Sequence, residues 1–209
     1  GSDIAVNSTN LVVAGRKPSN GGPVICVSTD GGSTWSTTRT YTPAGTGTTN
    51  QIALDPTSNN TFYVAGSLSG SGKVFKSTDG GIAANYTSNT PTGTTEIKSV
   101  VVDPATTSTL YCGSAGNGAF KSTNSNGSWS AINPGLPANS TINALAIDAN
   151  ATSTVYAGTA ASGLWKTTNG GTGWADATVW ILTTTSNVKN LFLHPSNSSA
   201  CYIGGADGT

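Results

Sequence analysis

The acidic residues of this 209-residue chain are the first candidates for chemistry, because two carboxylates that face each other across a cleft can act as a general acid and a general base. Most carboxylates here are explained by repeated turns, which leaves Asp3, Glu96, Asp176 and Asp207. Glu96 precedes the first strand expected in a third repeat unit, and Asp176 lies in the connection that leads to a fifth. These two form the one acid/base pair that we can assemble. Isolated acids in surface loops are usually only solvated, so the main prediction is that the chain carries no catalytic residue, with this pair as the alternative.

The other reactive side chains do not assemble into a site. His194, the only histidine, takes the place that Asp holds at equivalent corners, and no second His or Cys cluster accompanies it. We therefore expect neither a metal ion nor a cofactor. Cys26 and Cys112 fall on repeat positions otherwise held by buried apolar or small residues, which predicts free buried thiols. A disulfide between Cys26 and Cys201 is conceivable only if the last unit abuts the first.

Trp180 is the one aromatic residue that the repeat pattern does not explain. It stands beside Ile181 and Leu182 in the last connection between units. Two roles stay open for Trp180: a binding role, in which the ring stacks on a sugar, and a structural role, in which it fills a gap at a subunit contact.

A recurring phrase organises the chain. Residues 28–35 read Ser-Thr-Asp-Gly-Gly-Ser-Thr-Trp. Weaker copies begin at Ser77, Ser122 and Thr167, so that successive copies start 49, 45 and 45 residues apart. The defining residues are Ser28, Asp30, Gly32 and Trp35, then Ser77, Asp79 and Gly81, then Ser122, Asn124 and Trp129, then Thr167, Asn169, Gly171 and Trp174. An Asp or Asn here can accept hydrogen bonds from backbone N–H groups two or three residues on, while Gly adopts a positive φ. Each turn offers at most one carboxylate, so we interpret the phrase as a hairpin turn and not as a calcium loop.

Short apolar runs bounded by Asp-Pro, Gly-Gly and Asn-Gly signals predict four strands in each unit. In the second unit we expect strands near 51–55, 61–66, 73–77 and 84–88. Four antiparallel strands repeated about every 46 residues are typical of a β-propeller blade, so the predicted fold is an all-β propeller or partial propeller. The single repeat domain, 1–209, comprises units at about 1–48, 49–95, 96–139 and 140–186, with a half unit at 187–209.

The repeat register also predicts the core. Cys26, Phe75, Phe120 and Trp165 share one position, and Trp35, Trp129 and Trp174 share another after the turn. Because a four-stranded sheet cannot bury both of its faces by itself, we expect all of these side chains to pack between neighbouring blades.

The phrase at 28–35 resembles the Asp-box, or bacterial neuraminidase repeat, at every defined position. Three short motifs accompany it: Lys-Ser-Thr-Asp-Gly-Gly after an aromatic residue, Asp-Pro, and Tyr-Ala-Gly. Together they look more like the sortilin and xyloglucanase branch than the sialidases. Unit two departs from the pattern, with Ala84 where the Trp belongs and Tyr86 two places later. The resemblance implies that these turns lie at the blade periphery, away from the ligand face, and that they mark the fold.

The resemblance also allows one activity to be tested by counting. Family sialidases bind the substrate carboxylate with three arginines and pair a Tyr nucleophile with Glu. This chain has only Arg16 and Arg39 and a single Glu, which excludes a complete sialidase site. The xyloglucanase branch would need the carboxylate pair considered above.

Charge and composition limit the partners. Nine basic and nine acidic residues cancel, so nothing indicates binding to nucleic acid, and no apolar run is long enough to cross a bilayer. A sparsely charged surface rich in Ser, Thr, Asn and Gly predicts an extracellular, secreted protein. The seven Asn-x-Ser/Thr sequons would permit glycosylation, at Asn7, Asn59, Asn85, Asn126, Asn139, Asn150 and Asn197.

The half unit leaves a strand edge that something must cover. A longer chain, a compact ring with a thin fifth blade, or strands supplied by a neighbouring subunit would each do so. Because the arginines of a sialidase site are missing and a catalytic carboxylate pair is not evident, we expect a secreted, non-catalytic scaffold or binding module. Its partner would be a glycan, a protein, or copies of itself through the open half-blade. The alternative is part of a glycoside hydrolase that resembles the xyloglucanases.

Overall fold

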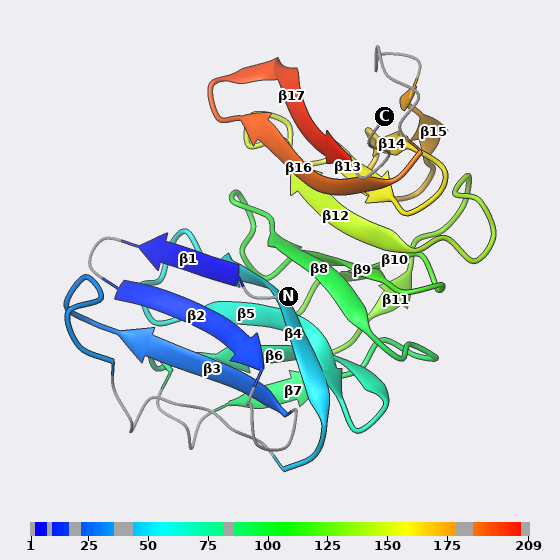
Figure 1. Ribbon diagram of the computed structural model, residues 1–209. Coiled ribbons are helices and arrows are strands. Elements are labelled where there is room, and N and C mark those ends of the chain that lie inside the picture. Colours follow the sequence, from blue (N-terminus) through cyan, green and yellow to red (C-terminus); the bar gives the residue numbers. More distant parts are fainter. Residues whose placement is uncertain are drawn as a thin grey trace.

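A computed structural model describes residues 3–7, 10–16, 22–35, 44–81, 86–178 and 186–205. Five antiparallel sheets follow one another in this part of the chain, and Figure 1 shows them fanning out as successive blades from the blue N-terminal end to the red C-terminal end. The prediction of an all-β fold built from four-stranded antiparallel blades is confirmed.

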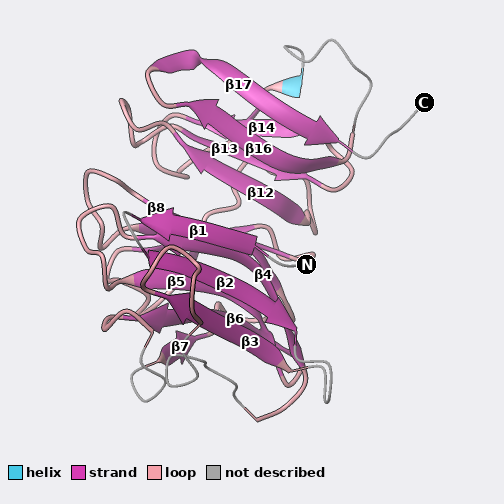
Figure 2. Ribbon diagram, turned by 60° about the vertical axis from the view of Figure 1, so that its left-hand side comes forward, coloured by secondary structure: helices cyan, strands magenta, loops and turns pink. Residues whose placement is uncertain are grey.

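Each blade is a simple meander in chain order (Figures 1 and 2). The strands are β1 (Asp3–Asn7), β2 (Asn10–Arg16) and β3 (Pro23–Ser28) in blade 1; β4 (Gly47–Leu54), β5 (Phe62–Leu68), β6 (Ser71–Ser77) and β7 (Thr87–Asn89) in blade 2; β8 (Ile97–Val102), β9 (Leu110–Ser114), β10 (Ala119–Ser122) and β11 (Ser130–Ala131) in blade 3; β12 (Ile142–Ile147), β13 (Val155–Thr159), β14 (Leu164–Thr167) and β15 (Ala175–Asp176) in blade 4; and β16 (Val188–His194) and β17 (Asn197–Gly205) in blade 5. A fourth strand of blade 1 would fall on residues that include 36–43, outside the described part. The expected strand at 84–88 is only partly described and is seen as β7.

The first strand of each blade contacts the first strand of the next blade, in the order β1, β4, β8, β12 and β16. They therefore form the inner side of the fan, and the fourth strands form its outer side. We call the face of a blade that meets the preceding blade its front, and the face that meets the following blade its back.

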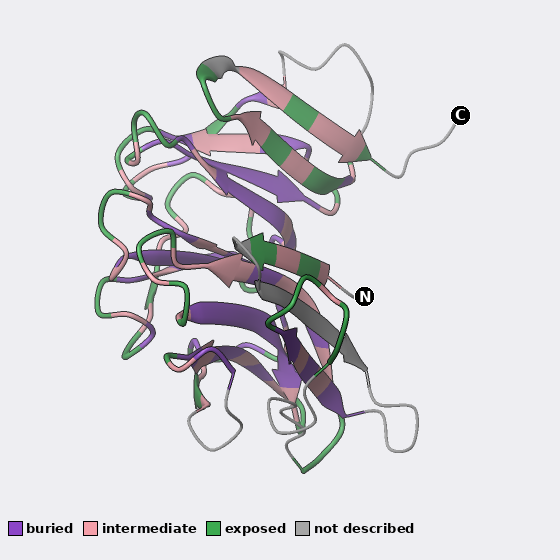
Figure 3. Cartoon of the chain, turned by 90° about the vertical axis from the view of Figure 1, so that its left-hand side faces the viewer, coloured by how far each residue is buried: buried purple, intermediate pink, exposed green. Residues whose placement is uncertain are grey.

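The core consists of layers between blades, because strand residues alternate between front and back. Ile25 and Val27 on the back of blade 1 pack against Ile52, Val64 and Phe75 on the front of blade 2. Equivalent layers join blades 2 and 3, blades 3 and 4, and blades 4 and 5. Figure 3 shows the result: the middle blades are mainly buried, whereas β1, β16 and β17 carry exposed residues.

The aromatic positions bear out the core prediction in most blades. Phe75, Phe120 and Trp174 are buried, and Trp129 and Trp165 are half-buried against core layers. In blade 2, Tyr86 packs into the layer with blade 1, with its ring edge-on to Phe62 at 5.9 Å. It thus performs the packing role that the Trp has in other units.

Trp35 corrects the prediction, since its side chain is 44% exposed. Trp129 and Trp174 each pack in the layer between their own blade and the preceding one. Trp35 occupies the same place on the front of blade 1, where no preceding blade exists in the described structure. Its position in the repeat is equivalent, but no described blade covers it.

Cys26 is also only half-buried, whereas Cys112 is buried as expected, and none of the three cysteines forms a disulfide.

The repeated turns close hairpins as predicted, but in blades 1, 3 and 4 the Asp or Asn accepts from an N–H group four residues on, not two or three. Asp30 Oδ1 accepts a hydrogen bond from the Thr34 N–H at 2.8 Å, and Asn124 and Asn169 likewise accept from N–H groups four residues on. The Ser or Thr that opens each turn accepts from the N–H four residues on as well. Hydrogen bonds from Thr34 and Ser28 lower the pKa of Asp30 to about 2. The fourth and fifth residues of each turn, counted from its Ser or Thr, have a positive φ, and the fifth is Gly in blades 1, 2 and 4 and Asn126 in blade 3.

In blades 2 to 5 a side chain closes the corner between the first and second strands. Asp55, Asp103 and Asp148 accept a hydrogen bond at 2.9 Å from the N–H two residues on. His194 does the same through Nδ1, which accepts from the Ser196 N–H at 3.3 Å. The prediction of a corner role for His194 is confirmed.

The two tryptophans at equivalent repeat positions make a stability test. Trp174 is 6% exposed and donates its Nε1–H to the Ile132 carbonyl at 2.6 Å. Trp174→Ala is expected to lower the free energy of unfolding by about 3–5 kcal/mol, and Trp35→Ala by less than about 1 kcal/mol. Urea unfolding followed by circular dichroism measures both. Equal losses would contradict the packing scheme, and Trp174→Phe covers the case in which the alanine variant does not fold.

Candidate functional site on the inner side of the blades

Four inner strands carry a β-bulge near their start. Pairing with the second strand skips one residue in each of blades 2 to 5, namely Asn50, Lys98, Asn143 and Lys189. A bulge leaves the extra residue out of the ladder and re-aims its side chain. All four bulge residues line one hollow of about 320 Å³, together with Ala160 and Asn187. We call it the inner hollow.

The hollow continues into a second one of about 230 Å³ that reaches across the fan. Asp3 of blade 1 and Leu191 of blade 5 both line this second space. The inner strands of the first and last described blades therefore approach the same polar centre.

Polar side chains join the blades around this centre. Asn50 Nδ2 donates to the Ile97 carbonyl of blade 3 at 2.7 Å, and Asn143 Nδ2 donates to the Val188 carbonyl of blade 5 at 3.1 Å. Asp3 accepts from the Ile52 N–H at 2.9 Å. Gln51 accepts from the Val100 N–H, also at 2.9 Å. These bonds satisfy backbone groups on the open edge of an inner strand, which has a sheet partner on one side only.

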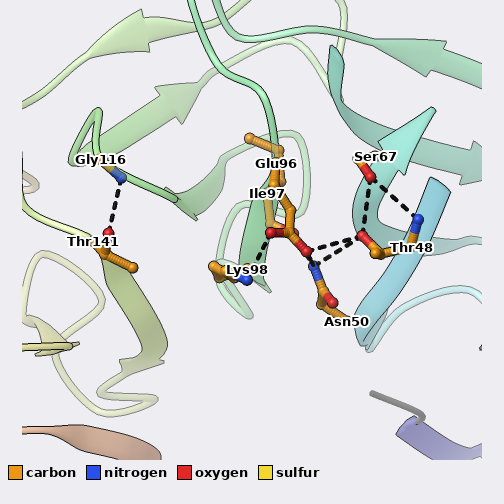
Figure 4. A network of polar contacts seen from close by, with 8 residues as sticks. All are labelled: Thr48, Asn50, Ser67, Glu96, Ile97, Lys98, Gly116 and Thr141. Atoms are coloured by element: carbon orange, nitrogen blue, oxygen red, sulfur yellow. Dashed lines mark hydrogen bonds and ion pairs between the residues drawn. The ribbon is translucent and has the colours of Figure 1, made fainter. Parts of the chain in front are cut away.

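Glu96 lies beside the hollow, directly before β8 as predicted, and is the centre of a polar network (Figure 4). Its carboxylate accepts hydrogen bonds from Thr48 Oγ1 and Asn50 Nδ2, both at 3.0 Å, and from Lys98 Nζ at 2.6 Å. Partial burial acts to raise its pKa, but these hydrogen bonds and the Lys98 charge lower it more, so that the net pKa is below the usual glutamate value. A general acid in glycoside hydrolysis needs a raised pKa instead.

The structure does not bring Glu96 and Asp176 together. Asp176 lies in β15, the outer strand of blade 4, and not in the connection where the sequence placed it. Its carboxylate accepts from the Thr178 N–H at 2.7 Å, and hydrogen bonds from the Thr178 side chain and backbone lower its pKa. The two carboxylates thus belong to different blades and to opposite sides of the fan. Trp180 and Asp207 lie outside the described residues.

Sequence reasoning missed the four bulge residues. They are spaced 48, 45 and 46 residues apart, and each precedes an inner-strand apolar residue by two places. A polar residue at one place in four repeats was the available signal. It was overlooked because the first strands were interpreted by their apolar residues alone.

The described part of the chain holds no group of three or more His, Cys, Asp or Glu side chains that could bind a metal ion. In the same residues, no helix is both long and apolar enough to cross a membrane.

No protein-family model matches the sequence, and no curated protein matches it. Solved structures do match. The GH74 enzyme of Niastella koreensis superimposes with a TM-score of 0.73 at 24% identity, over 99% of this chain and 33% of that one. The GH74 xyloglucanase of Xanthomonas campestris gives 0.74 at 16% identity, over 98% of this chain and 33% of that one. An ancestral GH74 enzyme gives 0.68 at 20% identity, over 92% and 26%. The chain spans about a third or less of these enzymes, and the likeness shows the β-propeller fold.

The Glu96 network predicts a pH-dependent contribution to stability. Because the pKa of Glu96 is lower in the folded than in the unfolded chain, the contribution is present above the unfolded value, about pH 4.3, and is lost as the pH falls through the folded value. Glu96→Gln should therefore lower the melting temperature at pH 7 and have progressively less effect towards pH 3. Thermal melts of both proteins between pH 3 and pH 7 measure this, and a constant difference across that range would contradict it.

Proposed function

We propose that the chain is a non-catalytic propeller module that binds a hydroxyl-rich ligand at the inner hollow. The observation that carries the proposal is the convergence of the four bulge residues, from four different blades, on one space. A residue that a bulge removes from its ladder is not needed for sheet pairing, so this position can vary to suit a ligand.

The side chains around the hollow indicate the chemical class. The amide N–H groups of Asn50 and Asn143 bond within the protein, which leaves their Oδ1 atoms to accept from sugar hydroxyls, and Asn187 adds a further amide to the lining. Lys98 is paired with Glu96, whereas Lys189 is exposed and adds a positive charge to the rim. An acidic glycan, with hydroxyls for the amides and a carboxylate for Lys189, fits this combination.

The carboxylates support a non-catalytic role. Asp30, Asp79, Asp55, Asp103 and Asp148 are engaged in turns and corners. Glu96 is held as an anion, and Asp176 lies on the outer side. Asp3 at the second hollow accepts hydrogen bonds from the Ile4 and Ile52 N–H groups, and Glu96 and Asp176 do not face each other across one cleft.

The resemblance to Asp-box propellers of the sortilin and xyloglucanase branch supports a secreted module, and so do the sequons and the low charge. A protein ligand, or copies of the chain, are further partners that such a module would accept. The competing proposal is that the chain is part of a glycoside hydrolase that resembles the xyloglucanases, with Glu96 as one catalytic carboxylate and the second one elsewhere. The structural likeness to GH74 enzymes supports it at the level of the fold.

Isothermal titration calorimetry with an oligogalacturonate tests the binding role. We expect binding that weakens with added salt, and a loss of about tenfold in affinity for Lys189→Gln, because a charge-assisted hydrogen bond is removed. Lys73→Gln is the matched control, since Lys73 is bonded to Thr90 at 2.6 Å on the third strand of blade 2 and should not matter. A neutral xyloglucan oligosaccharide should bind less tightly.

Two outcomes would overturn the proposal. One is the absence of saturable binding by any of these oligosaccharides. The other is release of reducing ends from xyloglucan by the purified chain, with loss of that activity in Glu96→Gln, which would establish the glycoside hydrolase instead.

A further inference from the structure

In blades 2 and 3, an N–H group at the inner edge of the first strand meets an acceptor side chain from the preceding blade. The Ile52 N–H of blade 2 donates to the Asp3 carboxylate of blade 1 at 2.9 Å. The Val100 N–H of blade 3 donates to the Gln51 side chain of blade 2, also at 2.9 Å. Asp3 and Gln51 hold equivalent repeat positions, one residue before Ile4 and Ile52 in matching strands. A side chain at this position thus satisfies a backbone group of the next blade.

The same position holds Ser99 in blade 3 and Ala144 in blade 4. Like Gln51, each directly follows the bulge residue of its strand. Ser99 is fully buried, and within the described residues its hydroxyl has no hydrogen-bond partner, so this short side chain does not reach the next blade. Ala144 has no polar atom in its side chain at all. The series of side-chain acceptors therefore does not continue into blades 3 and 4.

The Leu191 N–H of blade 5 is the group to which Ala144 offers no acceptor. Leu191 lies two places after the bulge residue of its strand and pairs with Ile203, just as Val100 pairs with Cys112 in blade 3. N–H groups along an antiparallel strand point alternately to its two sides. Because the register is the same, the Leu191 N–H points to the inner edge, as the Val100 N–H does.

Blades 4 and 5 are aligned at this point in the same way as blades 2 and 3. Asn143 Nδ2 donates to the Val188 carbonyl at 3.1 Å, and the equivalent hydrogen bond between blades 2 and 3 is 2.7 Å long. Val188 lies three residues before Leu191 on β16. Ala144, the residue after Asn143, therefore faces the Leu191 N–H. Both residues line the second hollow, of about 230 Å³.

The place beside Ala144 is accessible to a ligand. Lys189 and Asn190 line the same hollow, and Lys189 is exposed while Leu191 is half-buried. The equivalent place between blades 3 and 4 is closed, because Ser99 there is fully buried. Of the two places at which the side chain does not reach the next blade, we therefore expect a ligand at the one beside Ala144.

The charges at the second hollow favour an anion. Lys98, Lys189 and Asp3 are its charged lining residues. Lys98 is paired with Glu96 at 2.6 Å, and the Asp3 carboxylate already accepts from the Ile52 N–H. Lys189 has no ion pair within the described residues. A carboxylate has two oxygens, so it can accept from a backbone N–H and from an ammonium at the same time.

We propose that the second hollow is a subsite for the carboxylate of an acidic sugar. One carboxylate oxygen accepts from the Leu191 N–H, in the way that the Asp3 carboxylate accepts from the Ile52 N–H, and the other oxygen faces the Lys189 ammonium. The subsite rests on the proposed function, because it gives the acidic group of that ligand its place. A neutral sugar of the same shape lacks the group that this subsite recognises.

An NMR titration of ¹⁵N-leucine-labelled protein at neutral pH tests the contact. Galacturonate is expected to move the Leu191 amide resonance downfield and to saturate, because its N–H then donates to a carboxylate. Galactose, which has a hydroxyl in place of the carboxylate, should leave it nearly unmoved. The Leu164 amide is the matched control, since it already donates to Thr178 Oγ1 at 3.1 Å in blade 4. The Leu191→Ile protein, in which the resonance is lost, identifies it.

Ala144→Asp builds the missing acceptor into the chain, at the repeat position where Asp3 already reaches a backbone N–H. The Leu191 amide should then resonate downfield without any ligand, and galacturonate should no longer move it. Ala144→Leu adds a side chain of similar size without an acceptor, and it should not produce the downfield shift. The titration of the unchanged protein does not depend on the folding of either variant.

Two results would reject the subsite. If galacturonate leaves the Leu191 amide unmoved while calorimetry shows saturable binding of the oligogalacturonate, the carboxylate binds elsewhere and the proposed function stands. If galactose and galacturonate move the amide equally, the place recognises hydroxyls. Movement by galacturonate without any binding of the oligogalacturonate would support the subsite and reject the proposed function, and no effect of either ligand would reject both.

Discussion

The structure depends on one constraint: a four-stranded sheet with two apolar faces cannot bury them by itself and needs neighbouring sheets to cover them. Each blade therefore places its front on the back of the blade before it, and the core is a series of layers, not one central mass. Burial at a given repeat position follows from having a neighbour. Trp174 is buried and Trp35 is 44% exposed although they occupy equivalent positions.

The inner side of the fan links stability to the candidate site. Inner strands have an unpaired edge, and side chains such as Asp3 and Gln51 satisfy backbone N–H groups of the next blade there. The bulges near the start of these strands turn Asn and Lys side chains towards the same centre. A polar hollow thus arises where the sheets have backbone groups to satisfy, and the Glu96 network holds Lys98 at its rim.

In blades 2, 3 and 4 the outer strands are joined by a different contact. A Lys of the third strand lies over a Tyr of its own blade, and Lys76 and Lys121 also donate to the turn of the next blade. Through one side chain this arrangement joins the second and third strands of a blade to the turn of the next blade. The described part of blade 5 holds only the first two strands of this arrangement, with Tyr202 on β17 at the place of the earlier tyrosines.

The sequence by itself determined the repeat, the strand order within a blade, the turn and corner residues and most of the core. These features depend on short-range patterns: alternation in a strand, Gly at a positive φ, and an Asp or His that caps its own corner. Only the tertiary structure decided which equivalent residues are buried, that Asp176 lies far from the inner strands, and that Asn50, Lys98, Asn143 and Lys189 share a hollow. Those properties depend on which blade lies beside which and on where the ladder skips a residue. Neither can be deduced from local residue types, because a bulge and a regular pair can have the same polar residue in the sequence.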